Sequence, residues 1–148
     1  METQNKILNW PYELFDIECG KGWKDLYQPL IDYIEEYNAK HKPDSYFEIH
    51  QIKEKFAGLR FYWDGYNIPG DIAQEFQNRV EEAESKSYQI CEQCGSRENV
   101  GMTCKGWYYT VCEDCLRKMV EKSNIEYKWK CNDKIYIVNK DGKIEQPE

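Results

Sequence analysis

Residues 91–115 read CEQCGSRENVGMTCKGWYYTVCEDC and contain two Cys-x-x-Cys pairs, Cys91 with Cys94 and Cys112 with Cys115. Seventeen residues separate the two pairs. Each Cys-x-x-Cys turn lets two thiolates converge on one side of a short loop, so two such turns supply the four sulfur ligands of a tetrahedral zinc site. The spacing therefore predicts a structural Zn²⁺ site made by these four cysteines.

The residues beside the pairs indicate the local structure of this site. Gly95 follows Cys94 and can take the positive φ that turns the chain away from the metal, as in a zinc knuckle. Leu116, Met119 and Val120 follow Cys115 at helical spacing, which puts the second pair at the start of a helix whose dipole favours thiolates. Residues 106–111, GWYYTV, are strand formers. The order knuckle, strand, helix is typical of treble-clef and zinc-ribbon modules.

Free core thiols or redox dithiols are the alternative interpretations of the motif, and the spacing, Gly95 and the helix pattern together favour zinc. A site closed by four cysteines leaves no open coordination position, so we expect the metal to stabilise the fold and not to catalyse. Cys104 could replace one ligand, although its spacing is less suitable. Cys19 and Cys131 are expected to be buried small apolar residues.

Composition limits the class of protein. The chain of 148 residues is long enough for one core plus a small metal-stabilised unit. Seven cysteines without a signal peptide or a long apolar run predict a cytoplasmic protein with no membrane span. A net charge of −7 without a basic run argues against general DNA binding.

The first half of the chain has the pattern of helix, hairpin and helix. An aromatic stretch at residues 10–17 precedes a helical pattern from Trp23 to about Lys40, in which Pro29 either follows a separate turn or lies in the first turn of the helix. Residues 46–63 predict a β-hairpin with Ala57-Gly58 at its turn. After a loop, Asp71 is expected to cap a helix with a stripe of apolar residues, Ile72, Phe76, Val80 and Ala83.

The short joint at Ser87 and Tyr88 indicates that this half packs against the zinc module. Residues 125–146 alternate strongly and carry turn signals at Asn132-Asp133 and Asp141-Gly142, which predicts a two-stranded or three-stranded meander. The predicted fold class is therefore α+β. Residues 1–88 form an α+β domain with helices packed on a β-hairpin, and residues 89–148 form a zinc-ribbon or treble-clef-like module with a β-rich C-terminus.

The word pattern of the middle of the chain resembles a known family. QIKEKFAGLRFYWDG at residues 51–65, then ICEQCG and GWYYTVCEDC, is similar to a family of small proteins from phage, prophage and bacterial genomes with a Lys-Glu-Lys-Phe-Gly-Gly-Leu-Arg-Phe-Tyr segment before a four-cysteine zinc ribbon. Ala57 stands, beside Gly58, where that family has another glycine. The resemblance covers residues 51–115, implies a phage or mobile-element setting, and brings no activity with it.

The hairpin carries the candidate ligand-binding residues Lys53, Lys55, Arg60 and Tyr62. In the second strand Leu59, Phe61 and Trp63 share one face, and Arg60 and Tyr62 point the other way. Cationic donors beside an aromatic ring suit a phosphate, a nucleotide or an acidic patch on a partner. The alternative is a solvated face on which Arg60 pairs with Glu48 or Glu54, an arrangement of small energetic value.

No catalytic residues are predicted. His41 and His50 have no metal-binding or triad spacing, and the glutamate clusters have the pattern of solvated helix faces. We therefore expect a non-enzymatic, zinc-stabilised binding protein of phage type that engages a host or defence-related protein.

Two alternatives to a protein partner remain, and a homodimer is compatible with the many aromatic residues. The first alternative is a sponge-like binder of a nucleotide or other phosphorylated small molecule through the cationic hairpin. The second is nucleic-acid binding through the zinc module, with five candidate contacts, Lys105, Trp107, Tyr108, Arg117 and Lys118.

Overall fold

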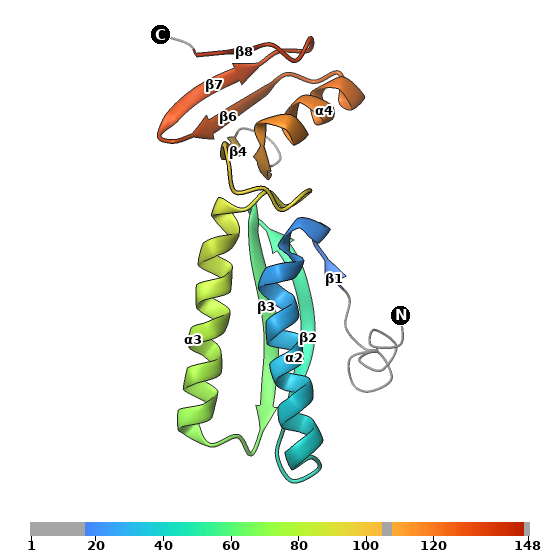
Figure 1. Ribbon diagram of the computed structural model, residues 1–148, viewed down its shortest axis with the longest axis vertical. Coiled ribbons are helices and arrows are strands. Elements are labelled where there is room, and N and C mark those ends of the chain that lie inside the picture. Colours follow the sequence, from blue (N-terminus) through green and yellow to red (C-terminus); the bar gives the residue numbers. More distant parts are fainter. Residues whose placement is uncertain (1–16, 105–107, 147–148) are drawn as a thin grey trace.

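The computed structural model describes residues 17–104 and 108–146, which form two units joined near Ser87 (Figure 1). Within these ranges the chain has three α-helices and two β-sheets, so the expected α+β class is confirmed. Residues 10–16 of the predicted aromatic stretch and the candidate contacts Lys105 and Trp107 lie outside the described residues.

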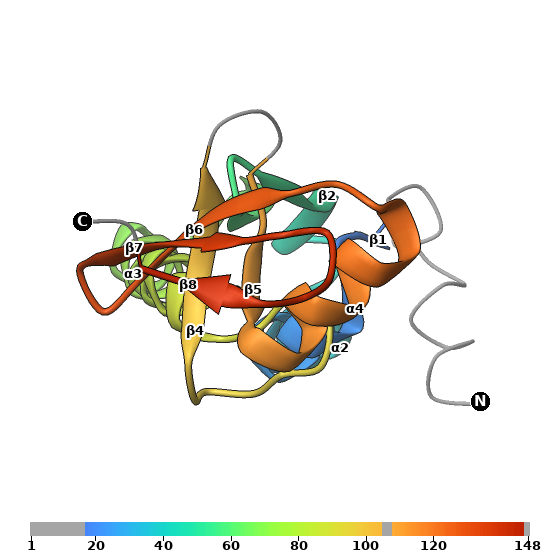
Figure 2. The same ribbon diagram turned by 90° about the horizontal axis from the view of Figure 1, so that it is seen from above.

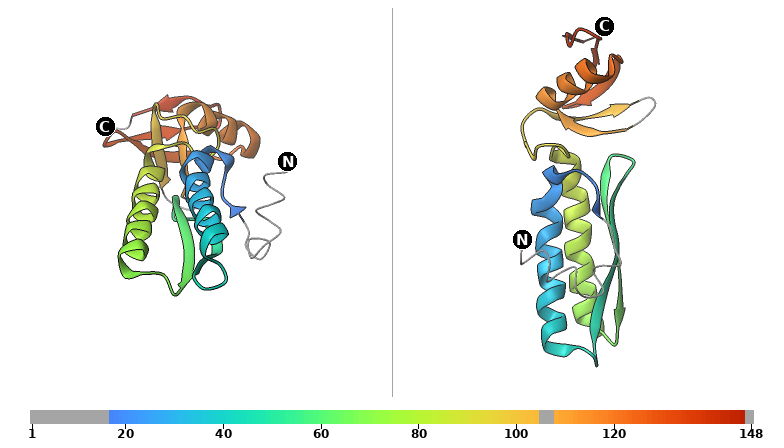
Figure 3. Two further views of the ribbon diagram at one scale, coloured as in Figure 1. Left: turned by 60° about the horizontal axis from the view of Figure 1, so that its bottom comes forward. Right: turned by 90° about the vertical axis from the view of Figure 1, so that its right-hand side faces the viewer.

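The first unit is a small sheet with two helices on one face. Its elements are β1 (Ile17–Glu18), η2 (Lys21–Trp23), α2 (Lys24–His41), β2 (Tyr46–Lys55), β3 (Gly58–Tyr66) and α3 (Gly70–Lys86). In the order β1-β2-β3, β1 runs parallel and β3 antiparallel to β2. Both helices lie on the same side of the hairpin (Figure 3, right). On the opposite face, which the helices leave uncovered, Tyr88 contacts Arg60 near the hairpin turn.

An aromatic cluster fills the space between the helices and the hairpin. Phe76 of α3 is completely buried, and its ring centroid lies 4.9 Å from that of Phe47, 5.1 Å from that of Trp63 and 5.2 Å from that of Tyr33. The predicted apolar stripe of α3 is therefore confirmed at Phe76, Val80 and Ala83, while Ile72 packs against the edge of the core.

Both predictions about the helix starts are wrong in detail. Pro29 lies inside one continuous helix, α2, because Leu26 and Leu30 on either side of it are buried in the core. Their burial holds the helix although the proline ring removes the hydrogen bond to the Asp25 carbonyl. In α3 the N-cap is Pro69, and Asp71 sits in the first turn without a capping hydrogen bond.

The hairpin is confirmed, and its turn lies one residue earlier than expected. Lys55 pairs with Gly58, which leaves Phe56 and Ala57 as the two turn residues with φ of 53° and 71°. Two consecutive left-handed residues define the type I′ turn that suits the twist of a hairpin. Positive φ is unusual for both residue types, so sequence propensity gave no signal for a turn here.

The second unit is a five-stranded sheet with one helix. Its elements are η3 (Ser87–Gln89), β4 (Val100–Cys104), β5 (Thr110–Cys112), α4 (Glu113–Ser123), β6 (Tyr127–Cys131), β7 (Lys134–Val138) and β8 (Ile144–Glu145). The strand order is β5-β4-β6-β7-β8, and α4 lies beside these strands (Figure 2). Leu116 and Val120 of α4 are completely buried against the sheet.

The predicted meander is confirmed as three strands, and its first turn has Asn132 and Asp133 at φ of 53° and 65°. The strand predicted at residues 106–111 is wrong in its bounds, because β5 begins only at Thr110. No sequence pattern predicts β4, which pairs with both β5 and β6. β4 joins the metal-binding segment to the meander in one sheet.

Candidate metal centre

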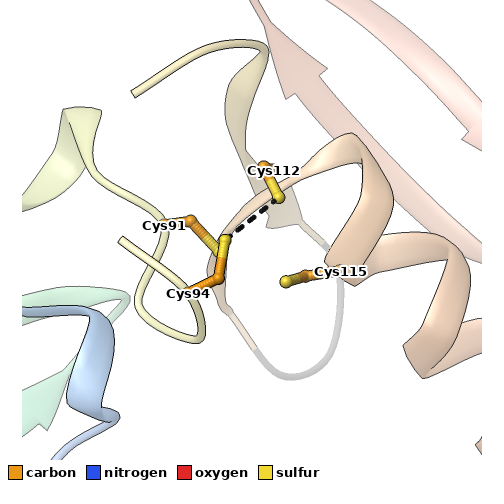
Figure 4. Close-up of side chains that lie close together, drawn as sticks. All are labelled: Cys91, Cys94, Cys112 and Cys115. Atoms are coloured by element: carbon orange, nitrogen blue, oxygen red, sulfur yellow. Dashed lines mark hydrogen bonds between the residues drawn. The ribbon is translucent and has the colours of Figure 1, made fainter. Parts of the chain in front are cut away.

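The four cysteines of the two pairs come together in space (Figure 4). Their sulfur atoms all lie within 4.8 Å of one another, and the Cys94 and Cys112 sulfurs are 3.7 Å apart. A tetrahedral zinc with Zn–S bonds of about 2.3 Å would separate its sulfurs by roughly 3.8 Å. All four thiols are free, so the cluster is compatible with a bound metal ion.

The first pair lies on a tight loop. The Cys91 N–H donates to the Ser96 carbonyl at 2.8 Å, and the Gly95 N–H donates back to the Cys91 carbonyl at 2.9 Å. Gly95 has a φ of +85°, which a glycine adopts without steric cost. The expected role of Gly95 is therefore confirmed, because its turn points the thiols of Cys91 and Cys94 to one side.

The second pair lies at the start of α4. Cys112 is the N-cap residue, with extended φ and ψ of −80° and 170°, and Cys115 follows in the first turn. The Cys115 N–H, which hydrogen-bonds the Cys112 thiol, and the positive end of the helix dipole favour negatively charged sulfurs here. This placement confirms that the second pair begins a helix.

Burial and hydrogen bonding act differently on the thiols. The Ser96 N–H lowers the pKa of Cys94, the most exposed of the four. Burial raises the pKa of Cys112, and burial followed by the neighbouring sulfurs raises that of Cys115. A cation held by the four sulfurs would lower both raised pKa values, because metal binding displaces thiol protons.

The other cysteines lie apart from this cluster within the described ranges. The Cys104 thiol faces the Lys128 carbonyl at 3.8 Å, and the Cys131 thiol faces the Val100 carbonyl at 3.5 Å. Cys131 is buried and Cys19 is partly buried against the first core, as expected for small apolar residues. Cys104 is not among the clustered ligands.

The structure brings the candidate hairpin residues onto one surface. Lys53 is directly opposite Arg60, and Tyr62 is opposite Gln51, so their side chains share the face that the helices leave uncovered. The Arg60 guanidinium donates to the Leu59 carbonyl at 2.9 Å and to the Tyr88 hydroxyl at 3.2 Å. The sequence predicts Tyr88 only as part of the joint between the two halves, because residue order gives no signal for a contact with β3.

The carboxylates near this surface have other partners. Glu54 accepts a hydrogen bond from the Ala57 N–H at 2.8 Å, and Glu18, the neighbour of Lys53 on β1, accepts one from Gln51 at 2.9 Å. Among the described residues no carboxylate lies within 4.0 Å of the Lys53 or Arg60 nitrogens. The expected alternative pairing of Arg60 with Glu48 or Glu54 is absent there.

The candidate nucleic-acid contacts on the second unit are partly engaged. Arg117 donates to Glu113 at 2.8 Å and to the Gly142 carbonyl at 2.6 Å. Lys118 and Tyr108 are exposed. The histidines are elsewhere: His50 lies 3.8 Å from Asp64, and the His41 ring packs on Tyr37.

No protein-family model, curated protein or solved structure matches this chain. In the described ranges, no helix has the length and apolar character needed to cross a membrane.

Proposed function

We propose that the metal is zinc and that its role is structural. A donor set of four thiolates is typical of structural zinc, and the 3.7 Å spacing of Cys94 and Cys112 fits its tetrahedral geometry. A knuckle, a β-strand and a helix that supplies the second pair correspond to the treble-clef-like arrangement. Native mass spectrometry of protein purified without a chelator should show one zinc per chain, and it also reports whether the chain forms a homodimer.

We further propose that the chain is a non-enzymatic binding protein of the phage type that it resembles, and that it engages a host or defence-related protein in the cytoplasm. The uncovered face of the β1-β2-β3 sheet supports this function. Tyr46 and Tyr66 stack there at 5.3 Å between ring centroids, and Tyr66 and Tyr62 are 53% and 40% exposed. Tyrosine combines apolar area with a hydroxyl and is enriched at protein interfaces.

The charges at the turn end of this face, where Lys53 and Arg60 lie, favour a partner with an acidic surface, whereas Glu48 faces Asp64 farther along the strands. Like charges directly opposite on neighbouring strands destabilise a sheet, yet Lys53 faces Arg60. Hydrogen bonds to Leu59 and Tyr88 hold the Arg60 guanidinium in place. An acidic patch on a partner would remove the repulsion between the two cations.

The test is capture of a host protein with the wild type, Arg60→Glu and Lys140→Glu as separate baits. Lys140 is exposed in the turn between β7 and β8, so its variant makes the same charge change away from the proposed face. A specific partner, once purified, should bind Arg60→Glu at least about tenfold more weakly, or about 1.4 kcal/mol, and bind Lys140→Glu like the wild type. Equal binding of all three would exclude this face.

The same pair of cations supports a second candidate function, the binding of a nucleotide or other phosphorylated small molecule. A guanidinium held by Tyr88 is oriented before the anion arrives, which favours charge-assisted hydrogen bonds to phosphate. A nucleotide that binds the folded state should raise the melting temperature, and Arg60→Glu should abolish the shift. No shift with any nucleotide would leave the protein partner as the remaining proposal.

A further inference from the structure

The loop of residues 91–95, called the metal loop below, carries Cys91 and Cys94. It contacts the first unit through the segment Gly20–Trp23, which has the sequence GKGW and lies some seventy residues earlier in the chain. Three hydrogen bonds join them. The Gly22 N–H donates to the Glu92 carbonyl at 2.7 Å, the Gly20 N–H donates to the Glu92 carboxylate at 2.8 Å, and the Trp23 indole N–H donates to the Ile90 carbonyl at 2.8 Å. All three acceptors are on Ile90 and Glu92, the residues on either side of Cys91.

The two segments approach too closely for any side chain at the glycines. A Cβ on Gly22 would lie 2.5 Å from the Glu92 carbonyl oxygen and 2.6 Å from the Gly95 nitrogen, and would also collide with the Cys91 carbonyl. A Cβ on Gly20 would collide with the Glu92 backbone. The atoms in the way are mostly backbone of the metal loop, which cannot move aside without moving the ligands.

Glu92 extends the connection to the rest of the metal centre. It lies between Cys91 and Cys94 and is almost completely buried, and its N–H donates to the Thr110 carbonyl at 3.0 Å. Thr110 in turn donates through its hydroxyl to the Ala57 carbonyl of the hairpin. The loop that carries the first two ligands is thus fixed between the start of α2 and β5.

From this geometry we propose that Gly20–Trp23 is a positioning segment of the metal centre, an inference that rests on the zinc site proposed above. Neither glycine touches the metal; the segment holds the Cys91–Cys94 loop in the conformation that directs its thiols toward Cys112 and Cys115. Groups that orient metal ligands commonly change metal affinity 10-fold to 100-fold when they are altered. Because linkage is reciprocal, metal occupancy also stabilises the order of Gly20–Trp23 and the start of α2.

Substitution of the glycines tests the first half of this proposal. Gly22→Ala should weaken zinc binding about tenfold or more in competition with a chromogenic chelator. Gly70→Ala is the matched control, since a Cβ there meets no atom within 4 Å. Ile34→Val is the control for general loss of stability, because Ile34 is completely buried in the same core about three turns farther along α2. Both controls should keep wild-type zinc affinity.

Amide hydrogen exchange of the wild-type protein tests the second half and remains decisive if Gly22→Ala does not fold. Removal of zinc with a chelator should make the Gly20 and Gly22 amides exchange at least about tenfold faster, while the amides in the middle of α3 keep their protection. The proposal is overturned if Gly22→Ala folds and binds zinc as tightly as the wild type, or if the Gly22 amide stays protected after the metal has left. Equal weakening by Ile34→Val would also overturn it, because general instability would then explain the effect.

Discussion

The replacement Cys91→Ser tests the metal centre most directly. Cys91 is completely buried, and its hydroxyl replacement is a poor zinc ligand, so three thiolates would remain. Structural zinc contributes about 10–16 kcal/mol of apparent binding free energy in small metal-dependent domains. A whole domain is stable by only about 5–15 kcal/mol, so loss of the metal removes an amount of free energy comparable to the whole stability of the second unit.

The second core is small, so the second unit should depend strongly on the metal for its stability. Two of its buried residues are the candidate ligands Cys91 and Cys112, and Leu116 and Val120 lie on α4, the helix that starts at the cysteine cluster. We expect Cys91→Ser to lose zinc and to lose amide protection in β6 and β7, while the middle of α2 and α3 stays folded around Phe76. Native mass spectrometry and amide hydrogen exchange measure both effects on one sample.

Cys104→Ser is the matched control, because this thiol lies outside the four-sulfur cluster. It should keep one zinc per chain and a wild-type exchange pattern. Retention of zinc by Cys91→Ser, with β6 and β7 still protected, would refute the assignment of the ligands. Release of zinc by Cys104→Ser would refute it equally.

Four other outcomes follow from the structure. Phe56→Gly should raise the free energy of unfolding by about 1 kcal/mol, because Phe56 is exposed and held at positive φ; a lower melting temperature would contradict the strain at this turn. Phe76→Ala should cost about 3–5 kcal/mol in a denaturant titration, and a loss below about 1 kcal/mol would mean that the aromatic cluster does not support the core. Pro29→Ala should raise the melting temperature by restoring the hydrogen bond to Asp25, and no rise would show that the helix start already accommodates the proline. Burial raises the pKa of the Cys19 thiol from 9.0 to about 12, so the unfolded chain loses this proton first and stability should fall as pH rises from 9 toward 12; Cys19→Ala should lessen that fall, and identical profiles would exclude Cys19 as its cause.

Local sequence signals predict much of this fold. The Cys-x-x-Cys spacing and Gly95 identify the knuckle, and the stripe containing Phe76 and Val80 identifies α3. Asn132-Asp133 marks the turn of the meander. In each case residues within one or two turns of one another determine the structure, so one segment contains the whole signal.

The features that the sequence does not predict depend on contacts between segments that are far apart in the chain. Pro29 argues against a continuous helix when α2 is considered alone, and burial of Leu26 and Leu30 against the sheet outweighs that local preference. The turn at Phe56-Ala57 has two residues that disfavour positive φ, and the pairing of β2 with β3 imposes it. Tertiary packing overrides propensity in both cases.

The contact between the GKGW segment, residues 20–23, and the loop that carries Cys91 and Cys94 is the clearest example of a feature that depends on a distant contact. Gly20 and Gly22 flank a single residue before a buried tryptophan, and nothing nearby requires a glycine, since neither has positive φ. Their requirement comes from the backbone of residues 91–95. A four-cysteine ribbon that folded by itself would place no such demand on residues 20 and 22. The backbone contacts therefore argue that the cysteine cluster belongs to both units, so a metal ion bound there would stabilise the start of α2 together with the second sheet.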